Sequence, residues 1–259
     1  MSFIKDIFAR NAALAWTGMG FLVLSLVLSI WIPYNEVEVL GINSLIKPLK
    51  FSISIWIFCW TTAYIIHYFN DKRIVKRLTV LIIVTMLYEQ AVITIQAMRG
   101  TLSHFNTETP LEGLLFSLMG VFITAMTLYF LYANFKFWRQ DDTLTPVVKS
   151  SIFWGVNIFV FAGLMGGFMA GFLSHNVGGE MGGESLPFVN WSTEYGDLRI
   201  GHFIGLHALQ VIPIVGFRIN RTINDDQKAV RLLHLITILY FSVVIFTFGQ
   251  AFLGLPFWG

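Results

Sequence analysis

The sequence predicts an all-helical integral membrane protein, a single bundle of seven transmembrane helices. Of its 259 residues, 56% are hydrophobic and 12% are charged, whereas soluble domains carry about 25% charged residues. Apolar runs long enough to cross a hydrocarbon core of about 30 Å recur along the chain. Lysine and arginine collect in alternate segments between these runs. Such a chain has too few charges to cover a surface that faces only water.

The apolar runs define the expected helices within one domain, 1–259. They lie at about 12–33, 49–69, 77–98, 111–135, 147–173, 198–218 and 231–255. The first run is too long for the apolar part of a signal peptide, so we expect a retained helix. The third and sixth runs contain the most polar residues. Polar groups inside a span are costly, so we expect these two helices to hide one face from lipid.

Orientation follows from the basic residues. If the N-terminus is cytoplasmic, 13 of the 17 lysines and arginines fall in inner segments and four in outer ones. This bias predicts a cytoplasmic N-terminus and a C-terminus outside the membrane, in the periplasm. The outer segment 174–197 is long and contains two glycine pairs, which predicts a cap or lid. An idle, solvated loop is the alternative.

The sixth helix carries a polar stripe. At about 100° per residue, Arg199, His202, His207 and Gln210 share an arc of about 140°, and Asp197 stands where an N-cap is expected. The fifth helix carries Gly163, Gly167 and Gly171 at four-residue spacing, which predicts close helix packing or room for a flat ligand.

The third helix also has a single polar face. Because neither polar face can contact lipid, we expect the third and sixth helices to meet. Their meeting predicts a cavity that opens outward beneath segment 174–197. Its expected lining is Glu89, Gln96, Arg99, Arg199, His202, His207 and Gln210.

Glu89 is the only carboxylate well inside an expected span. A buried carboxyl group must be paired, bind a metal or carry a proton. We therefore take Glu89 and His207 as candidate catalytic or proton-transfer groups, with a structural pairing of Glu89 as the alternative.

Four histidines collect toward the outer side, two on the sixth helix and two on outer loops. Together with a carboxylate they predict a haem or transition-metal site. The candidate ligands are His202, His207, His104, His175 and Glu89. The zinc motif HExxH is absent. A cysteine-based metal motif is absent as well, because Cys59 is the only cysteine. The alternative is that each histidine is a structural, hydrogen-bonded residue.

The outer basic residues stand at the ends of three helices and predict a cationic ring. Such a ring suits haem propionates, a carboxylate or a phosphate. The candidate binding residues are Lys47, Lys50, Gln96, Arg99, Arg199 and Gln210. Side chains that extend toward the interface, or neutralisation by the outer carboxylates, are the alternatives.

Three segments carry a resemblance to a known family. QAMRGTLSHFNTETP (96–110), LPFVNWSTEYGDLRIGHFIGLHALQVIP (186–213) and INSLIKPLKFSISIW (42–56) resemble a family of bacterial integral membrane proteins of uncharacterised function. The resemblance covers most of the chain. It implies a multi-pass protein of the bacterial inner membrane and carries no activity.

The function expected first is a redox protein that binds haem or a transition metal, because histidines cluster around a carboxylate. The alternatives are a small-solute transporter or proton-coupled channel, in which Glu89 and His207 titrate, and a sensor or assembly subunit. Catalysis and homo-oligomerisation are left open. The expected partners are the lipid bilayer and an anionic small molecule at the outer face, and no nucleic acid is expected. The chain lacks a P-loop, a GxSxG elbow, a Rossmann fingerprint and a mid-helix lysine for retinal.

Overall fold

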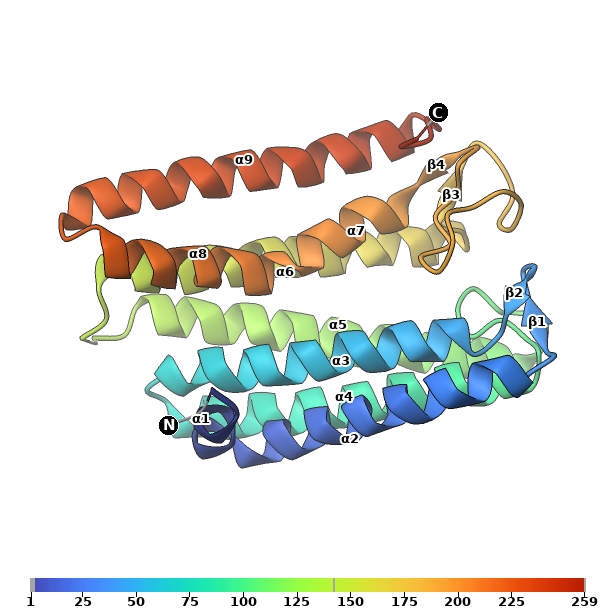
Figure 1. Ribbon diagram of the computed structural model, residues 1–259, viewed down its shortest axis with the longest axis horizontal. Helices are drawn as coiled ribbons and strands as arrows, with labels where there is room; N and C mark the ends of the chain where they lie inside the picture. Colours follow the sequence, from blue (N-terminus) through green and yellow to red (C-terminus); the bar gives the residue numbers. More distant parts are fainter. Residues whose placement is uncertain (1–2, 142, 259) are drawn as a thin grey trace. The chain divides into compact units, whose positions relative to one another are not determined.

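A computed structural model describes residues 3–141 and 143–258. The described part is helical, and seven of its helical segments are long and apolar enough to cross a membrane (Figure 1). These segments are Ala12–Tyr34, Ile46–Tyr68, Lys72–Met98, Pro110–Trp138, Pro146–Phe172, Leu198–Thr222 and Asp226–Phe252. Each contains most of one expected run, so the prediction of seven spans is confirmed.

The elements fall into two compact units, Met1–Met126 and Thr127–Gly259, whose boundary lies within α5 (Pro110–Trp138). The first unit contains α1 (Phe3–Arg10), α2 (Ala12–Trp31), η1 (Ile32–Tyr34), β1 (Glu38–Val39), β2 (Ile42–Asn43), α3 (Ile46–Ile65), η2 (Ile66–Tyr68) and α4 (Lys72–Met98). The second contains α6 (Pro146–Phe172), β3 (Asn176–Val177), β4 (Gly196–Asp197), α7 (Leu198–Leu206), α8 (Ala208–Thr222) and α9 (Asp226–Phe252).

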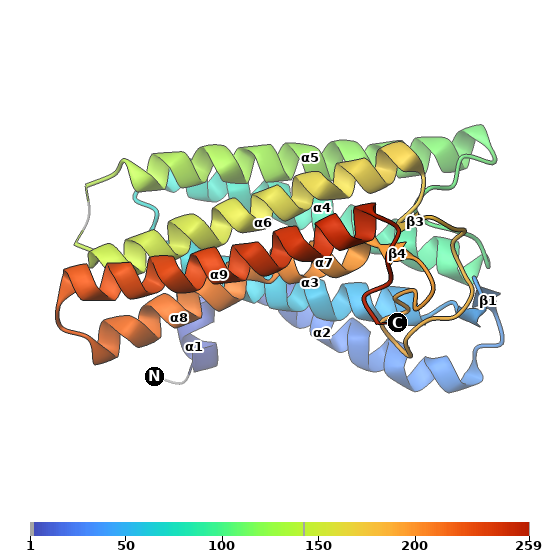
Figure 2. The ribbon, with the colours of Figure 1, turned by 90° about the horizontal axis from the view of Figure 1, so that it is seen from above.

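In the first unit, α2 packs closely on α3. A Cβ atom added to Gly18 would lie 2.5 Å from Cδ1 of Trp60, so only glycine leaves room for that indole ring. The ring nitrogen of Trp60 donates to the Ala15 carbonyl oxygen at 3.1 Å. The short helix α1 runs across the end of this pair (Figure 2). The N-cap of α4 is Asp71, whose carboxylate accepts from the amides of Arg73 and Ile74 at 2.8 and 3.1 Å.

In the second unit, α6 packs against α7 and α8 through small residues. An added Cβ atom at Gly216 would lie 2.2 Å from Cβ of Ser151, and one at Gly205 would lie 2.5 Å from Cβ of Ala162. At Gly155 it would lie 2.9 Å from Cδ of Pro213. Of the three glycines expected to pack closely, Gly163 meets α5, where an added Cβ atom would lie 3.4 Å from Cγ2 of Thr127. Added Cβ atoms at Gly167 and Gly171 meet nothing within 4 Å, so the packing expectation is wrong for these two positions.

Segment 174–197 has a folded structure of its own. The strands β3 and β4 pair antiparallel, with Asn176 opposite Asp197. An added Cβ atom at Gly196 would lie 2.1 Å from the Ala251 carbonyl oxygen, so the returning strand lies directly against the last turns of α9. This packing argues against an idle, solvated loop. We call the segment the cap.

Candidate functional site

The sixth span is interrupted at His207. Helix α7 ends at Leu206 and α8 begins at Ala208. The His207 amide donates to the Phe203 carbonyl oxygen at 3.2 Å, which is α-helical spacing. The His207 carbonyl oxygen accepts from Val211 at 2.9 Å and also from Gln210 at 3.0 Å, and the second of these bonds has the tighter spacing of a 3₁₀ turn. Six residues on, Pro213 lacks the amide that would bond to the Leu209 carbonyl. The sixth helix is therefore locally distorted around His207.

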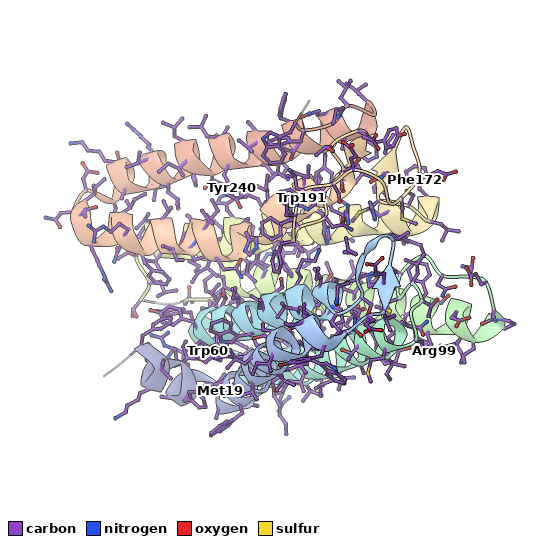
Figure 3. All side chains as sticks on the ribbon, turned by 45° about the vertical axis from the view of Figure 1, so that its right-hand side comes forward. Met19, Trp60, Arg99, Phe172, Trp191 and Tyr240 are labelled. Atoms are coloured by element: carbon purple, nitrogen blue, oxygen red, sulfur yellow. The ribbon has the colours of Figure 1, made fainter. Side chains whose placement is uncertain are left out.

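A tyrosine stabilises this interruption. The hydroxyl of Tyr240 on α9 donates to the Ile204 carbonyl oxygen at 2.5 Å. Figure 3 shows Tyr240 between α9 and the interrupted span. On α6, Gly155 permits the close approach, because an added Cβ atom would lie 3.0 Å from the Ala208 carbonyl oxygen. The Ile204 carbonyl group thus bonds to a neighbouring helix, whereas the His207 carbonyl group continues the helical pattern through Val211.

The histidines of the sixth span make structural contacts of different kinds. Nδ1 of His202 lies 2.8 Å from the Ala162 carbonyl oxygen, which fixes it as the donor. The ring of His202 lies over Gly166, where an added Cβ atom would be 3.2 Å from Cε1. The ring of His207 instead packs edge-on against Phe203, with 4.4 Å between centroids. Phe203 in turn contacts Trp191 of the cap at 5.6 Å, so the cap and the interruption are linked by aromatic rings.

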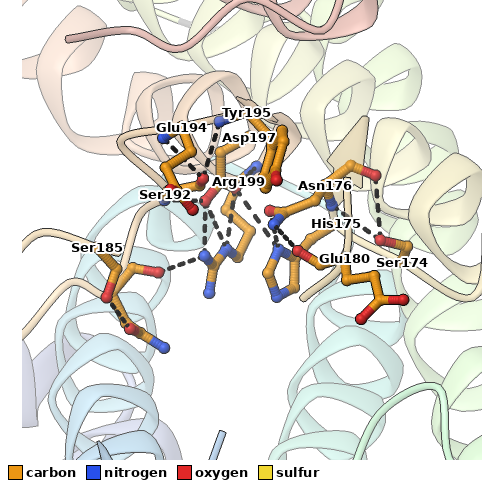
Figure 4. Close-up of polar contacts among 11 residues, drawn as sticks. Ser174, His175, Asn176, Glu180, Ser185, Ser192, Glu194, Tyr195, Asp197 and Arg199 are labelled. Atoms are coloured by element: carbon orange, nitrogen blue, oxygen red, sulfur yellow. Dashed lines mark hydrogen bonds and ion pairs between the residues drawn. The ribbon is translucent and has the colours of Figure 1, made fainter. Parts of the chain in front are cut away.

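Asp197 organises the cap (Figure 4). It is the N-cap of α7, as predicted, and its side chain accepts from the Arg199 amide at 3.0 Å. The Arg199 guanidinium binds both carboxylate oxygens, with Nη2 2.6 Å from Oδ2. The Ser192 amide donates to Oδ2 at 2.9 Å. Burial raises the pKa of Asp197. The hydrogen bonds and charge of Arg199, the charge of His175 and the hydrogen bond from the Ser192 amide together outweigh this effect, so the pKa of Asp197 is lowered overall.

His175 and Asn190 complete this cluster. Nδ1 of His175 lies 2.8 Å from Oδ1 of Asn176 and 3.9 Å from Oδ1 of Asp197. Arg199 also donates to the carbonyl of Asn190, a residue in the left-handed region with φ 57°, which asparagine tolerates better than most residues. The cap therefore converges on Asp197 and Arg199 from both of its ends.

In the first unit, Glu89 is buried in α4 with 6% of its surface exposed. No hydrogen bond or ion pair reaches its carboxyl group from any described residue. Lys47 is close enough to act on this carboxyl group through its charge. The neighbouring Gln90 donates to the Pro48 carbonyl oxygen at 3.2 Å, whereas its own Oε1 is buried without a partner among the described residues.

Two of the outer residues meet beside this carboxyl group. The Lys47 ammonium group carries only donors, so it donates to Nδ1 of His104, at 3.3 Å. The Ser103 hydroxyl lies 3.2 Å from the same nitrogen. His104 is therefore held as an acceptor at Nδ1.

Arg99 and Gln96 form a separate polar group at the end of α4. Nη1 of Arg99 donates to Oε1 of Gln96 at 2.6 Å, and Nη2 donates to Oε1 of Glu112 at 2.8 Å. Glu112 also accepts from Thr109, and its amide donates to Oγ1 of Thr109 at 3.3 Å. A TPLE sequence is a capping-box signal that was available in the sequence and that would have singled out Glu112.

The predicted metal site is not supported. Within the described ranges, no group of three or more histidine, cysteine, aspartate or glutamate side chains is placed to hold a metal ion. The expected ligands are engaged elsewhere: His202 by the α6 backbone, His175 by Asn176 and Asp197, and His104 by Lys47. Among the candidate ligands, Glu89 and His104 belong to the first unit, and His175, His202 and His207 belong to the second.

The predicted cationic ring is also not supported for its two arginines. Arg99 forms an ion pair with Glu112, and Arg199 forms one with Asp197. These pairs match the alternative in which outer carboxylates neutralise the basic residues. Lys47 and Lys50 also interact with other residues of the chain. Each guanidinium group is therefore already paired with one carboxylate.

The fold and these groups define an all-helical, multi-pass membrane protein with a buried carboxyl group in one unit and a capped, interrupted span in the other. No protein-family model, curated protein or solved structure matches the chain.

Proposed function

We propose that the chain is a proton-coupled transporter or channel for a small solute, with Glu89 and His207 as the groups that bind and release protons. One observation carries the proposal. Glu89 is 6% exposed inside a span, yet no described residue forms a hydrogen bond or ion pair with it. A structural pairing would explain its burial, but among the described residues only the charge of Lys47 acts on it, without a hydrogen bond or ion pair. Intramembrane carboxyl groups of this kind mark proton and ion pathways.

The interruption at His207 supports the same class of protein. Transporter sites are commonly built from discontinuous helices, whose unwound turns release backbone groups inside the membrane. Here the interruption lies in the sixth span, with a titratable imidazole at the turn itself. The transition-metal alternative would be supported by at least three gathered ligands, and within the described residues no such group is placed to hold a metal ion.

The test measures proton movement directly. The full chain would be reconstituted in liposomes that contain a pH-sensitive dye, and proton entry would be driven by an imposed membrane potential, with and without a panel of small organic ions. We expect the wild type to admit protons and Glu89→Gln to reduce this entry strongly. Glu112→Gln is the matched control, since Glu112 is paired with Arg99 at a span end, and it should retain the flux. Equal proton entry in the wild type and Glu89→Gln under every condition would contradict the proposal.

The proposed orientation has a cytoplasmic N-terminus and an outer C-terminus in a bacterial inner membrane. It is supported by the 13 to 4 division of basic residues. Single cysteines at Asp226 and at Glu184, both exposed, would be introduced after Cys59→Ser. A membrane-impermeant reagent added to intact cells should label position 184 and not position 226. The reverse pattern would overturn the orientation.

A further inference from the structure

The exposed face of α4 is basic at its start and apolar farther along, and the proposed function uses neither part. Taking Lys72 as 0°, the exposed side chains of the first two turns fall within an arc of about 140° at 100° per residue. All four are basic: Lys72, Arg73, Lys76 and Arg77. The residues on the opposite side, Ile74 and Leu78, are buried.

The same arc continues as an exposed apolar stripe. Val80, Val84 and Leu87 are 53%, 45% and 53% exposed, and they fall at about 80°, 120° and 60°. Ile95 and Met98 extend the stripe to the far end of the helix at 55% and 53% exposure. A cluster of positive charges is thus followed directly by an apolar stripe on one helix face.

Within the part of the chain that the structure describes, the cluster keeps a net positive charge. No ion pair joins any of the four basic side chains to a described residue. Asp71 is the neighbouring acid, and its carboxylate caps α4, whose amides lower its pKa. Four positive charges and one negative charge within residues 71–77 leave a net charge of +3. Arg73 and Arg77 lie one turn apart, and the planar guanidinium fork matches phosphate oxygens.

The neighbouring helix α1 is also suited to a membrane surface. Phe3 and Ile4 are 66% and 49% exposed, whereas Ile7 is fully buried. The side chain of Asn11, directly after α1, donates to Oγ1 of Thr79 at 2.8 Å, which ties α1 to the start of α4. A short helix that runs across the bundle end with exposed apolar side chains is typical of the interface between headgroups and acyl chains.

We propose that this face of α4 binds one anionic phospholipid. The phosphate contacts the cluster Lys72, Arg73, Lys76 and Arg77, and one acyl chain lies along Val80, Val84 and Leu87. Charge complementarity selects the headgroup, and the continuity of charge with the apolar stripe selects a lipid over a soluble anion. The proposal does not depend on proton coupling.

The test uses phosphatidylglycerol and phosphatidylcholine that carry the same photoreactive acyl chain, added separately to the full chain in phosphatidylcholine vesicles. We expect phosphatidylglycerol to cross-link preferentially to peptides containing residues 80–87. Each basic side chain near an anionic headgroup contributes about a fivefold preference, so Arg73→Gln with Arg77→Gln should lower the preference about 30-fold. Arg218→Gln with Arg221→Gln, which removes two exposed charges elsewhere, should leave it unchanged.

Two further measurements keep the test decisive if the neutral variant inserts poorly. Arg73→Lys with Arg77→Lys keeps the charge and should retain most of the preference. For the wild type, high salt should reduce the preference by screening, whereas inorganic phosphate at equal ionic strength should reduce it no further. Equal cross-linking of both lipids, equal loss in the Arg218 and Arg221 control, or displacement by phosphate beyond its effect as a salt would each overturn the proposal.

Discussion

The guanidinium group of Arg199 is bound by both carboxylate oxygens of Asp197, with Nε 2.9 Å from Oδ1 and Nη2 2.6 Å from Oδ2. The Asp197 side chain is fully buried and that of Arg199 is 26% exposed. Since Ser192 and Asn190 also bind this pair, the cap and the start of α7 share one ionic contact.

Asp197→Asn should therefore destabilise the protein by about 1–3 kcal/mol, because it removes the charge that balances a largely buried guanidinium group. The measurement is the free energy of unfolding in detergent. Glu112→Gln is the matched control, because its partner Arg99 is 48% exposed and water can replace the lost contact, so its cost should stay below about 1 kcal/mol. Equal losses in the two variants would show that the cap does not depend on this pair.

The lowered pKa of Asp197 predicts a pH dependence with a definite sign. A carboxyl group whose folded-state pKa lies below its unfolded value, about 3.9 for aspartate, stabilises the fold above that value and loses the contribution as pH falls through the folded pKa. The difference in unfolding free energy between the wild type and Asp197→Asn should be constant from pH 7 to 5 and shrink below about pH 4. A difference that does not change between pH 5 and 3 would contradict the assignment.

The seven spans were predictable from the sequence, because apolar length and the excess of basic residues are properties of contiguous segments. The capping role of Asp197 was predictable for the same reason, since an N-cap bonds to amides two or three residues away. The burial of Glu89 followed from its position between apolar turns, and the structure confirms it.

The contacts of the site residues were not predictable, because each depends on a partner distant in the chain. Arg99 pairs with Glu112 across a loop, His202 bonds to the backbone of α6, and Tyr240 binds the Ile204 carbonyl. The four-residue glycine spacing on α6 was misleading, because close approach needs small residues on both helices at one depth. Gly216 with Ser151 opposite, and Gly205 with Ala162 opposite, satisfy that condition. Gly167 and Gly171 meet no neighbouring helix.

The contact between α6 and α8 gives a second stability prediction. An added Cβ atom at Gly216 would lie 2.2 Å from Cβ and 2.3 Å from Oγ of Ser151, so Gly216→Ala should cost about 1–3 kcal/mol through overpacking. Ser151→Gly should recover part of this loss, giving a non-additive double mutant in thermal unfolding. The control is Gly171→Ala, which meets nothing within 4 Å and should gain up to about 1 kcal/mol. Destabilisation by the control, or additive effects, would argue against this packing.

Tyr240→Phe tests the interruption of the sixth span. Loss of the hydroxyl leaves the Ile204 carbonyl without the bond that holds it at 2.5 Å, so unfolding should become easier by about 1 kcal/mol. Amide hydrogen exchange should rise in residues 204–210 more than in the rest of the span. Tyr132→Phe, at a tyrosine 48% exposed on α5, should change neither quantity. Unchanged exchange at 204–210 in Tyr240→Phe would show that the interruption is stable without this hydroxyl.

The last prediction concerns Glu89 and His207, which the proposed function assigns to one proton pathway. Glu89 has no bonding partner among the described residues, so Glu89→Gln should cost little stability, and His207→Ala should remove the ring that packs on Phe203. If both groups serve one proton pathway, the effects of the two substitutions on proton entry into liposomes should be non-additive, by at least about 0.5 kcal/mol in a double-mutant cycle. Stability should behave differently, because each side chain contacts its own surroundings. Thermal unfolding of the same four proteins therefore separates a functional coupling from a general loss of folding. Additive effects on proton entry would assign Glu89 and His207 to separate purposes.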